Sequence, residues 1–450
     1  MTNLRLYMNR LEKEGNLLHI DDPLSPKYEI PAALKGLDGR GAVIFENVEG
    51  NSSKITAAIC GSRENIYAAL GVEADTFHKH LHFALNNPTP CKIEDGPVKE
   101  VVELPNLSNT PILTFYDRDQ GPYITSAVVY AKSPNGAGEN ASFHRLNVLD
   151  NNRLSIRMQP GHLFQFLNMA KSMGRKSLDV SISIGLHPAI MLAGASPAPF
   201  GTSEFDVANT LLGGELKLTE CPHVDALAPA DAELVLEGKI RLDEEANEGP
   251  FVSVTGTWKP EGLQPVVEVV GMMHREDYIY QALFAASIEH RLLEGMPNEI
   301  PVWEYVSSAV PTIRGVNMTI NGCSWLHCVV SFEKLQEGDP KSVIMAMFTA
   351  NPALKHAIVV DSDIDPYDMG QVEWAIATRL QGDKDILVIP NAYISGLDPS
   401  SDTENKLGCK LGIDATRTLS KSEEIFKRGV IPVSDRVGLL LEKLTTKYHH

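Results

Sequence analysis

Asn, His, Glu and Arg side chains between positions 140 and 251 are suited to metal binding and proton transfer. The Asn, His and Glu side chains together offer oxygen and imidazole ligands, which a hard or borderline cation such as Mg²⁺ or Mn²⁺ accepts. An Arg beside a Glu could orient a substrate carboxylate while the Glu moves a proton. These residues lie in four turn-rich segments, Asn140–Arg145, Gln159–His162, Gly194–Glu204 and Asn247–Phe251.

Ordinary structural explanations exist for the same residues. His162 follows a glycine and is typical of a loop histidine, and Glu204 after Ser203 is typical of a helix N-terminus. Glu248 precedes Gly-Pro, which indicates a turn. Lys410 by itself resembles a solvated surface lysine. Spacing alone leaves both the chemical and the structural interpretations open.

The helical and strand patterns around these residues predict a mixed α+β chain of three domains. Residues 1–110 combine an amphipathic helix ending at Gly15 with short strands at 42–45 and 54–59, which predicts an α/β domain that ends in a proline-rich linker. Residues 111–305 carry many alternating segments, which predict a barrel or curled sheet with helices at 163–173 and 204–212. Residues 306–450 alternate helical segments with apolar strands, which predicts a second α/β domain, and its last helix is expected over 431–447.

Composition excludes several classes of protein. The 450 residues carry a formal charge of −18, whereas nucleic acids and anionic membranes select for clustered positive charge. The six cysteines are scattered without a C-x-x-C pair, as expected for reduced thiols, and no apolar stretch approaches the length of a membrane span. We therefore expect a cytoplasmic protein with no nucleic-acid or membrane partner.

The order of the motifs resembles the UbiD family of decarboxylases. The motifs are N-x-x-x-x-R from Asn140, His162, Ser203-Glu204, the sequence E-G-P-F from Glu248, and Gly408-Cys409-Lys410 with the following Gly-Ile-Asp-Ala. The resemblance covers almost the whole chain and implies a central domain like the split barrel of flavin reductases. It also implies prenylated FMN as the cofactor, with Mn²⁺ (or Mg²⁺) and possibly K⁺.

Carried over position by position, the resemblance assigns a role to each residue. Asn140, His162 and Glu204 fall on the metal ligands, which tie the cation to the cofactor phosphate. Ser196 and Pro197 fall in the segment around that phosphate and the monovalent ion, and Lys410 falls on a lysine that contacts it. His144 and Arg145 are also expected to contact the cofactor, and Arg145 and Glu248 fall on the first two members of an Arg–Glu–acid catalytic set.

The third member of that catalytic set is missing. Ser253 stands where the family has Glu or Asp, and serine has no carboxyl proton to donate. Two alternatives stay open from the sequence: Glu248 serves both steps, or a group within Ser287–His290 acts instead. Glu289 and His290 are equally typical of a surface helix pair.

Within the family, the chain is most similar to an archaeal branch that decarboxylates anhydromevalonate phosphate. The residues that carry this similarity include Gly121–Ser126, Phe143–Leu146, Ile288–His290, Gly322–His327 and Leu397–Asp402. The branch implies conversion of trans-anhydromevalonate 5-phosphate to isopentenyl phosphate and CO₂ in an archaeal-type mevalonate pathway. An aromatic-acid (4-hydroxybenzoate-type) decarboxylase or carboxylase is the main alternative, and an FMN-binding flavin reductase is a remote one. The implied partners are a small-molecule substrate, a flavin prenyltransferase that supplies the cofactor, and copies of the same chain in a dimer or hexamer.

Overall fold

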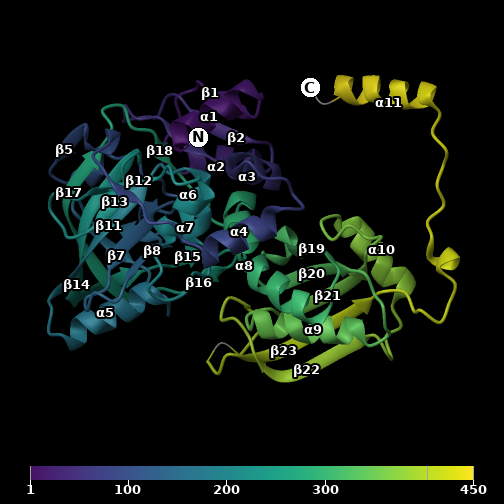
Figure 1. The fold of residues 1–450 in the computed structure, drawn as a ribbon. Helices are drawn as coiled ribbons and strands as arrows, with labels where there is room; N and C mark the ends of the chain where they lie inside the picture. The colour runs from purple at the N-terminus through teal and green to yellow at the C-terminus, as the bar shows by residue number, and fades with distance from the viewer. Residues whose placement is uncertain (1, 403, 449–450) are drawn as a thin grey trace.

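Leu4, Tyr7, Met8 and Leu11 recur at helical spacing and form the buried face of the first helix, α1 (Leu4–Lys13). Asn3 caps this helix by accepting a hydrogen bond from the Leu6 N–H. The computed structural model describes residues 2–402 and 404–448, and Figure 1 shows three parts followed by a C-terminal arm. No helix in the described residues is both long enough and apolar enough to cross a membrane.

The N-terminal part is a small sheet with helices, in the strand order β1-β2-β3-β18. Strand β18 (Tyr280–Gln281) belongs to a much later segment and pairs in parallel with β3, so the chain returns here after the central sheet. The remaining elements are β1 (Leu17–Ile20), α2 (Glu29–Gly36), β2 (Ala42–Phe45), β3 (Ile55–Ala57), α3 (Arg63–Leu70) and α4 (Phe77–Asn86).

The central part is a curled, nine-stranded antiparallel sheet in the order β6-β9-β10-β17-β14-β11-β7-β8, with β5 added beside β17. Its strands are β5 (Val101–Glu103), β6 (Tyr123–Ile124), β7 (Val128–Lys132), β8 (Glu139–Phe143), β9 (Leu146–Val148), β10 (Arg153–Ile156), β11 (Ser177–Ile184), β14 (Leu234–Glu248) and β17 (Gly262–His274). Smaller sheets join β4 (Lys92–Ile93) to β12 (Lys217–Glu220) and β13 (Leu227–Pro229), and pair β15 (Phe251–Val252) with β16 (Trp258–Lys259). The helices of this part are α5 (His162–Ser172), α6 (Pro188–Gly194) and α7 (Glu204–Leu211).

The C-terminal part is a five-stranded sheet in the order β19-β20-β21-β23-β22, in which β20, β21 and β23 run parallel. Ala357 and Val359 of β21 join the apolar core that contains α9, whereas Ile358 and Val360 join the core that contains α10, so the two helices cover opposite faces. The elements are β19 (Ile313–Met318), β20 (His327–Phe332), α9 (Asp339–Ala350), β21 (His356–Asp361), α10 (Met369–Arg379), β22 (Ile386–Tyr393) and β23 (Leu407–Ala415). Helix α8 (Ile288–Ala309) follows β18 of the N-terminal part and leads into β19 of the C-terminal part (Figure 1).

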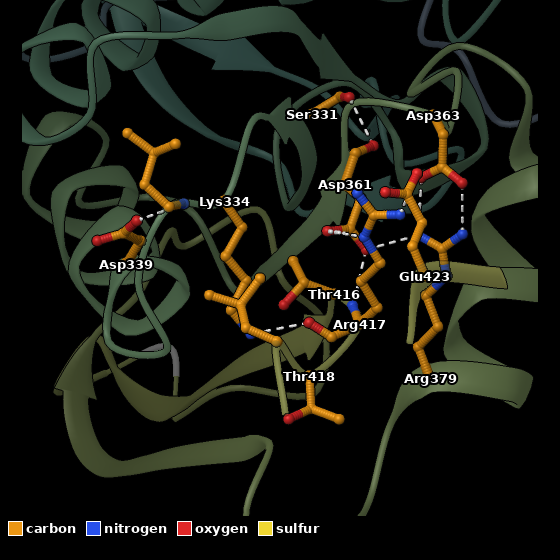
Figure 2. Close-up of polar contacts among 12 residues, drawn as sticks. Ser331, Lys334, Asp339, Asp361, Asp363, Arg379, Thr416, Arg417, Thr418 and Glu423 are labelled. Carbon is orange, nitrogen blue, oxygen red and sulfur yellow. Dashed lines mark hydrogen bonds and ion pairs between the residues drawn. The ribbon is translucent and has the colours of Figure 1, made fainter. Parts of the chain in front are cut away.

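A buried ion cluster fixes the start of the C-terminal arm. The side chain of Arg379 is fully buried and pairs with Asp361 at 2.5 Å and with Asp363 at 2.6 Å. Asp361 also accepts the backbone N–H of Arg417, and Arg417 pairs with Glu423 at 2.8 Å (Figure 2). Beyond this anchor the chain extends away from the body to α11 (Asp435–Tyr448), as Figure 1 shows.

The predicted mixed fold is confirmed, with one local difference. The curled central sheet between two α/β parts is the predicted architecture. The proline-rich stretch after Asn87 is not a free linker, because it contains β4 and β5, which pair with β12 and β17. The domain boundaries at residues 110 and 305 stay predictions, and α8 spans the second of them.

Candidate active site

Arg145 and Glu248 meet in a buried, bidentate ion pair. Arg145 follows β8, and its Nε and Nη2 donate to the two carboxylate oxygens of Glu248 at 2.7 and 2.9 Å. The Glu248 side chain is 0% exposed and stands at the end of β14, and the Arg145 guanidinium lies 4.5 Å from the centre of the Phe251 ring. This geometry holds a cation ready for a substrate carboxylate while its own anion keeps it neutralised.

The turn after Glu248 requires a glycine. Gly249 has a φ of +94°, and a Cβ at this position would lie 3.1 Å from the Pro260 carbonyl oxygen. The Gly249 N–H donates to the hydroxyl of Tyr123 at 3.1 Å. The close approach brings residues 258–262 against the end of β14 and therefore against the ion pair.

Three further cations border this pair, and in the part of the chain that the structure describes none of them has a close carboxylate partner of its own. Arg157 has its Nη1 at 3.6 Å from Glu248, and its Nε is buried without a hydrogen-bond partner in the described residues. Lys259 on β16 donates to the Gly396 carbonyl at 2.7 Å, and Arg291 on α8 donates to the Val254 carbonyl at 3.3 Å. Burial, with the charge of Arg145, lowers the pKa of Arg157, and burial, with the charge of Arg157, lowers that of Lys259. The result is a local surplus of positive charge in a chain whose net charge is −18.

Asn140, His162 and Glu204 come together from three elements. The backbone N–H that follows Asn140 on β8, that of Ala141, donates to Glu204 Oε2 at 2.6 Å. His162 begins α5, and its Nδ1 lies 4.0 Å from Glu204 Oε1 at the start of α7. Asn140 donates its amide N–H to Ser142 at 2.9 Å, and within the described residues its carbonyl oxygen accepts no hydrogen bond. The predicted metal set is therefore gathered at one place.

The donor set fits a divalent cation. Glu204 is 3% exposed, and burial raises its pKa to about 8, because no lysine or arginine in the described residues pairs with it. Burial also lowers the pKa of His162, which favours the neutral imidazole that binds metals. The Oγ of Ser203 is buried beside Glu204 and has no hydrogen-bond partner in the described residues. No group of three or more His, Cys, Asp and Glu forms a metal site in the described residues, so a cation here depends on the Asn140 oxygen as the third ligand.

The other predicted cofactor contacts are dispersed. The His144 ring bridges Ser142, at 3.1 Å, and the Arg157 carbonyl, at 3.0 Å, next to the metal set. Ser196 donates its hydroxyl to the Leu192 carbonyl at 2.7 Å, and Pro197 is exposed. Lys410 lies in the C-terminal sheet, where its Nζ donates to the carbonyls of Pro352 and Leu354 at 2.7 and 2.5 Å. With 6% exposure it is not a solvated surface lysine, and its contact with the cofactor stays a prediction.

Sequence reasoning missed Lys259 as a site residue. No motif in the sequence singles it out, because only the folded turn brings it near Arg157 and Gly396. Ser253 lies in the same turn, between β15 and β16, and is buried. The serine that replaces the acidic residue of the family pattern therefore lies close to the Arg145–Glu248 ion pair.

The fold and site define the class of protein: the chain belongs to the UbiD family of carboxy-lyases. Its residues 8–85, 91–288 and 291–415 match the N-terminal, Rift-related and C-terminal domain models of the 3-octaprenyl-4-hydroxybenzoate carboxy-lyases. The chain is 39% identical to the anhydromevalonate phosphate decarboxylase of Methanothermobacter thermautotrophicus, over 94% of this chain and 99% of the relative. It is 41% identical to the enzyme of that name from Methanocaldococcus jannaschii, over 92% and 97%.

Solved structures support the same class. The UbiD-class enzyme HmfF from Pelotomaculum thermopropionicum, in complex with FMN, superposes with a TM-score of 0.94 at 37% identity and covers 97% of this chain and 99% of its own. An apo 3,4-dihydroxybenzoic acid decarboxylase from Enterobacter cloacae superposes with a TM-score of 0.91 at 25% identity, over 98% and 99%. The chain is therefore a decarboxylase of this family.

Proposed function

We propose that this enzyme decarboxylates a branched α,β-unsaturated acid that carries a phosphate, converting trans-anhydromevalonate 5-phosphate to isopentenyl phosphate and CO₂. One observation of the structure supports it most: Arg157, Lys259 and Arg291 surround a pair, Arg145–Glu248, that is already neutral. An aromatic monocarboxylate needs one cation, whereas a carboxylate with a phosphate brings about three negative charges near neutral pH. The names of the most similar archaeal relatives agree with this substrate.

The proposed cofactor is prenylated FMN, with Mn²⁺ or Mg²⁺ held by Asn140, His162 and Glu204. When bound, the cofactor supplies the electron sink that an alkenoic acid lacks, since loss of CO₂ alone would leave charge on a vinylic carbon. The buried Glu204 carboxylate and the unpartnered Ser203 hydroxyl support a cation and a phosphate at this point. A monovalent cation such as K⁺ near Ser196 is the third component of the proposal.

Each residue of the site would then have a role that follows from its position. Arg145 would turn its donors from Glu248 to the substrate carboxylate and orient it, with the Phe251 ring supporting the guanidinium. Glu248, released from two hydrogen bonds, becomes able to accept and pass on a proton. Arg157, Lys259 and Arg291 hold the phosphate, which fixes the reacting carbon relative to Arg145.

The experiment is reconstitution with prenylated FMN, by co-expression with a flavin prenyltransferase, followed by assay of two acids. We expect isopentenyl phosphate from trans-anhydromevalonate 5-phosphate and no turnover of 4-hydroxybenzoate. The converse result would move the assignment to an aromatic-acid decarboxylase. Reduction of unmodified FMN by NAD(P)H, without decarboxylation, would move it to a flavin reductase.

A charge variant tests the phosphate contact itself. Arg157→Met should raise the KM for the phosphorylated acid about tenfold or more, since a hydrogen bond to a charged group contributes about 1.5–3 kcal/mol. Arg153→Met is the matched control, because Arg153 is an exposed arginine of β10 paired with Asp150. An equal effect of both variants would contradict a specific phosphate contact.

We also propose that the chain assembles with copies of itself through the C-terminal arm. Val430 and Ile431 are 86% and 84% exposed on the extended segment, and Leu439, Leu440 and Leu441 of α11 are more than half exposed. A long apolar arm that leaves the body, as Figure 1 shows, requires a partner surface to bury it. Truncation after Lys427, beyond the Arg417–Glu423 anchor, should lower the number of subunits in the assembly, as counted by native mass spectrometry. An unchanged number of subunits would refute the arm as the contact.

A further inference from the structure

The proton that replaces CO₂ needs a donor other than Ser253, and the resting geometry of Glu248 argues for a separate acid. Both Glu248 oxygens accept hydrogen bonds from Arg145, and Arg157 approaches one of them at 3.6 Å. A carboxylate bonded in this way is an acceptor, so a proton that Glu248 passes on after Arg145 turns to the substrate must first come from another group. The acid must therefore come from another element that borders the turn of Ser253.

Two neighbouring carboxyl groups are committed to backbone contacts. Glu289 is 2% exposed and accepts the backbone N–H groups of Ala58 and Cys60, each at 2.9 Å, so it faces the N-terminal part. Asp119 accepts two backbone N–H groups through Oδ2, at 3.1 and 2.9 Å, and its Oδ1 is buried without a hydrogen-bond partner in the described residues. Both oxygens of Glu289 are therefore engaged, and the one unpaired oxygen of Asp119 is buried where a substrate does not reach it.

Glu294 differs from both because it is paired only with a histidine. Its Oε2 lies 3.5 Å from Nε2 of His290, one helical turn earlier on α8, and the two side chains keep 27% and 26% exposure. The Nδ1 of His290 accepts the Ala286 N–H at 3.0 Å, which leaves the ring proton on Nε2, facing Glu294. Arg291, between them in sequence, donates to the Val254 carbonyl, so this turn of α8 lies against the turn that holds Ser253.

The charges around the two side chains favour a neutral pair. Burial raises the pKa of Glu294 to about 7, and burial, with the charges of Arg291 and Arg145, lowers that of His290 to about 4. Farther along α8, Arg63 and His78 both contact Glu299 and not Glu294. Among the described residues of α6, α9 and β19, none forms an ion pair with Glu294. Near neutral pH the pair is then an imidazole beside a carboxylic acid.

We propose that Glu294 donates the proton that replaces CO₂ and that His290 is its positioning residue, in place of the carboxyl group absent at Ser253. The inference rests on the proposed decarboxylation. In the step, the C–CO₂ bond breaks, its electron pair stays on the organic fragment, and the O–H proton of Glu294 moves to the carbon that lost CO₂. Glu294 is left as a carboxylate, which His290 Nε2–H stabilises until solvent returns the proton.

The test separates carbon–carbon cleavage from proton transfer. In the holoenzyme, Glu294→Gln should lower formation of isopentenyl phosphate at least about 10²-fold, the usual contribution of a general acid. It should preserve the exchange of ¹³C-labelled CO₂ into trans-anhydromevalonate 5-phosphate, which needs cleavage and its reversal but no proton. Glu304→Gln, an exposed glutamate of the same helix, should match the wild type in both measurements.

Each other outcome has a definite meaning. Unchanged product formation by Glu294→Gln, or parallel loss of product and exchange, overturns the inference. A wild-type enzyme that shows neither product nor exchange with this acid refutes the proposed function instead. The pH dependence of product formation adds a check. In the wild type, the rate should fall above about pH 7, where Glu294 loses its proton. His290→Asn should move the pH at which the rate falls, whereas Glu304→Gln should not. Without cofactor, the carboxylic-acid infrared absorption that disappears near pH 7 should be weaker in Glu294→Gln by the contribution of one carboxyl group, while the contribution of Glu289 remains.

Discussion

Replacement of Glu248 by glutamine tests the Arg145–Glu248 ion pair with the smallest change in side-chain shape. Glu248→Gln keeps the shape of the side chain but removes the charge that both short contacts of Arg145 use. Arg145 then remains 17% exposed, beside the like charge of Arg157, with no anion in the described residues within ion-pair distance. Removal of one partner of a buried pair costs about 3–5 kcal/mol, and since glutamine retains one acceptor we expect about 3 kcal/mol of lost unfolding free energy.

The same change should affect catalysis more strongly than substrate binding. A glutamine at position 248 can neither hold Arg145 by two charged contacts nor accept a proton, so turnover of trans-anhydromevalonate 5-phosphate should fall about 10²-fold or more. KM should change little, because Arg145 and the three neighbouring cations remain. Steady-state kinetics of the reconstituted enzyme, with urea unfolding followed by tryptophan fluorescence, measure both effects.

A matched control comes from another Arg–Glu pair of the same sheet. Glu268 on β17 is 43% exposed and lies 3.3 Å from Arg241, so Glu268→Gln should change the unfolding free energy by less than about 1 kcal/mol and leave turnover intact. Wild-type turnover by Glu248→Gln, with cofactor bound, would refute the assigned role. Equal destabilisation by the two variants would refute the argument from burial.

Three further predictions concern the metal set, a buried acid and the anchor of the arm. His162→Ala should lower metal and flavin content together, and full occupancy by metal analysis and mass spectrometry would contradict the ligand assignment. Burial raises the pKa of Glu289 to about 7, so its protonated form stabilises the fold at low pH. The contribution of Glu289 to the unfolding free energy should therefore fall by about 3 kcal/mol as pH rises from 4.5 to 7. In urea titrations at several pH values, Glu289→Gln should flatten this slope. Arg379→Met leaves the buried Asp361 without its shortest ion pair and should cost about 3–5 kcal/mol, whereas Arg314→Met, at an exposed pair, should cost less than about 1 kcal/mol.

Much of the fold could be predicted, because strands and helices leave their pattern of apolar residues within short stretches of sequence. Alternation and β-branched residues located strand β2 at Ala42–Phe45 and the curled central sheet, and helical patterns located α5 and α7. The full extent of α8 could not be predicted, since Pro297 and Pro301 lie within it and normally indicate a helix end. Tertiary packing against α9 and β19 overrides that signal.

Only those residues of the candidate site that belong to sequence motifs could be predicted. Ordered motifs indicated Asn140, His162 and Glu204, and the structure brings them together. Lys259 and Glu294 carry no motif, and they become site residues because a β-turn and a helix from separate segments meet beside Ser253. The burial of Lys410 likewise depends on the C-terminal sheet, which no local pattern around Gly408 reveals.

The central claim is tested most directly by one product measurement. Purified enzyme loaded with prenylated FMN and Mn²⁺ is incubated with trans-anhydromevalonate 5-phosphate, and isopentenyl phosphate and CO₂ are quantified together. Equal amounts of both products, with no turnover of 4-hydroxybenzoate, are the predicted result. Intact phosphorylated acid alongside decarboxylated aromatic acid would contradict the account.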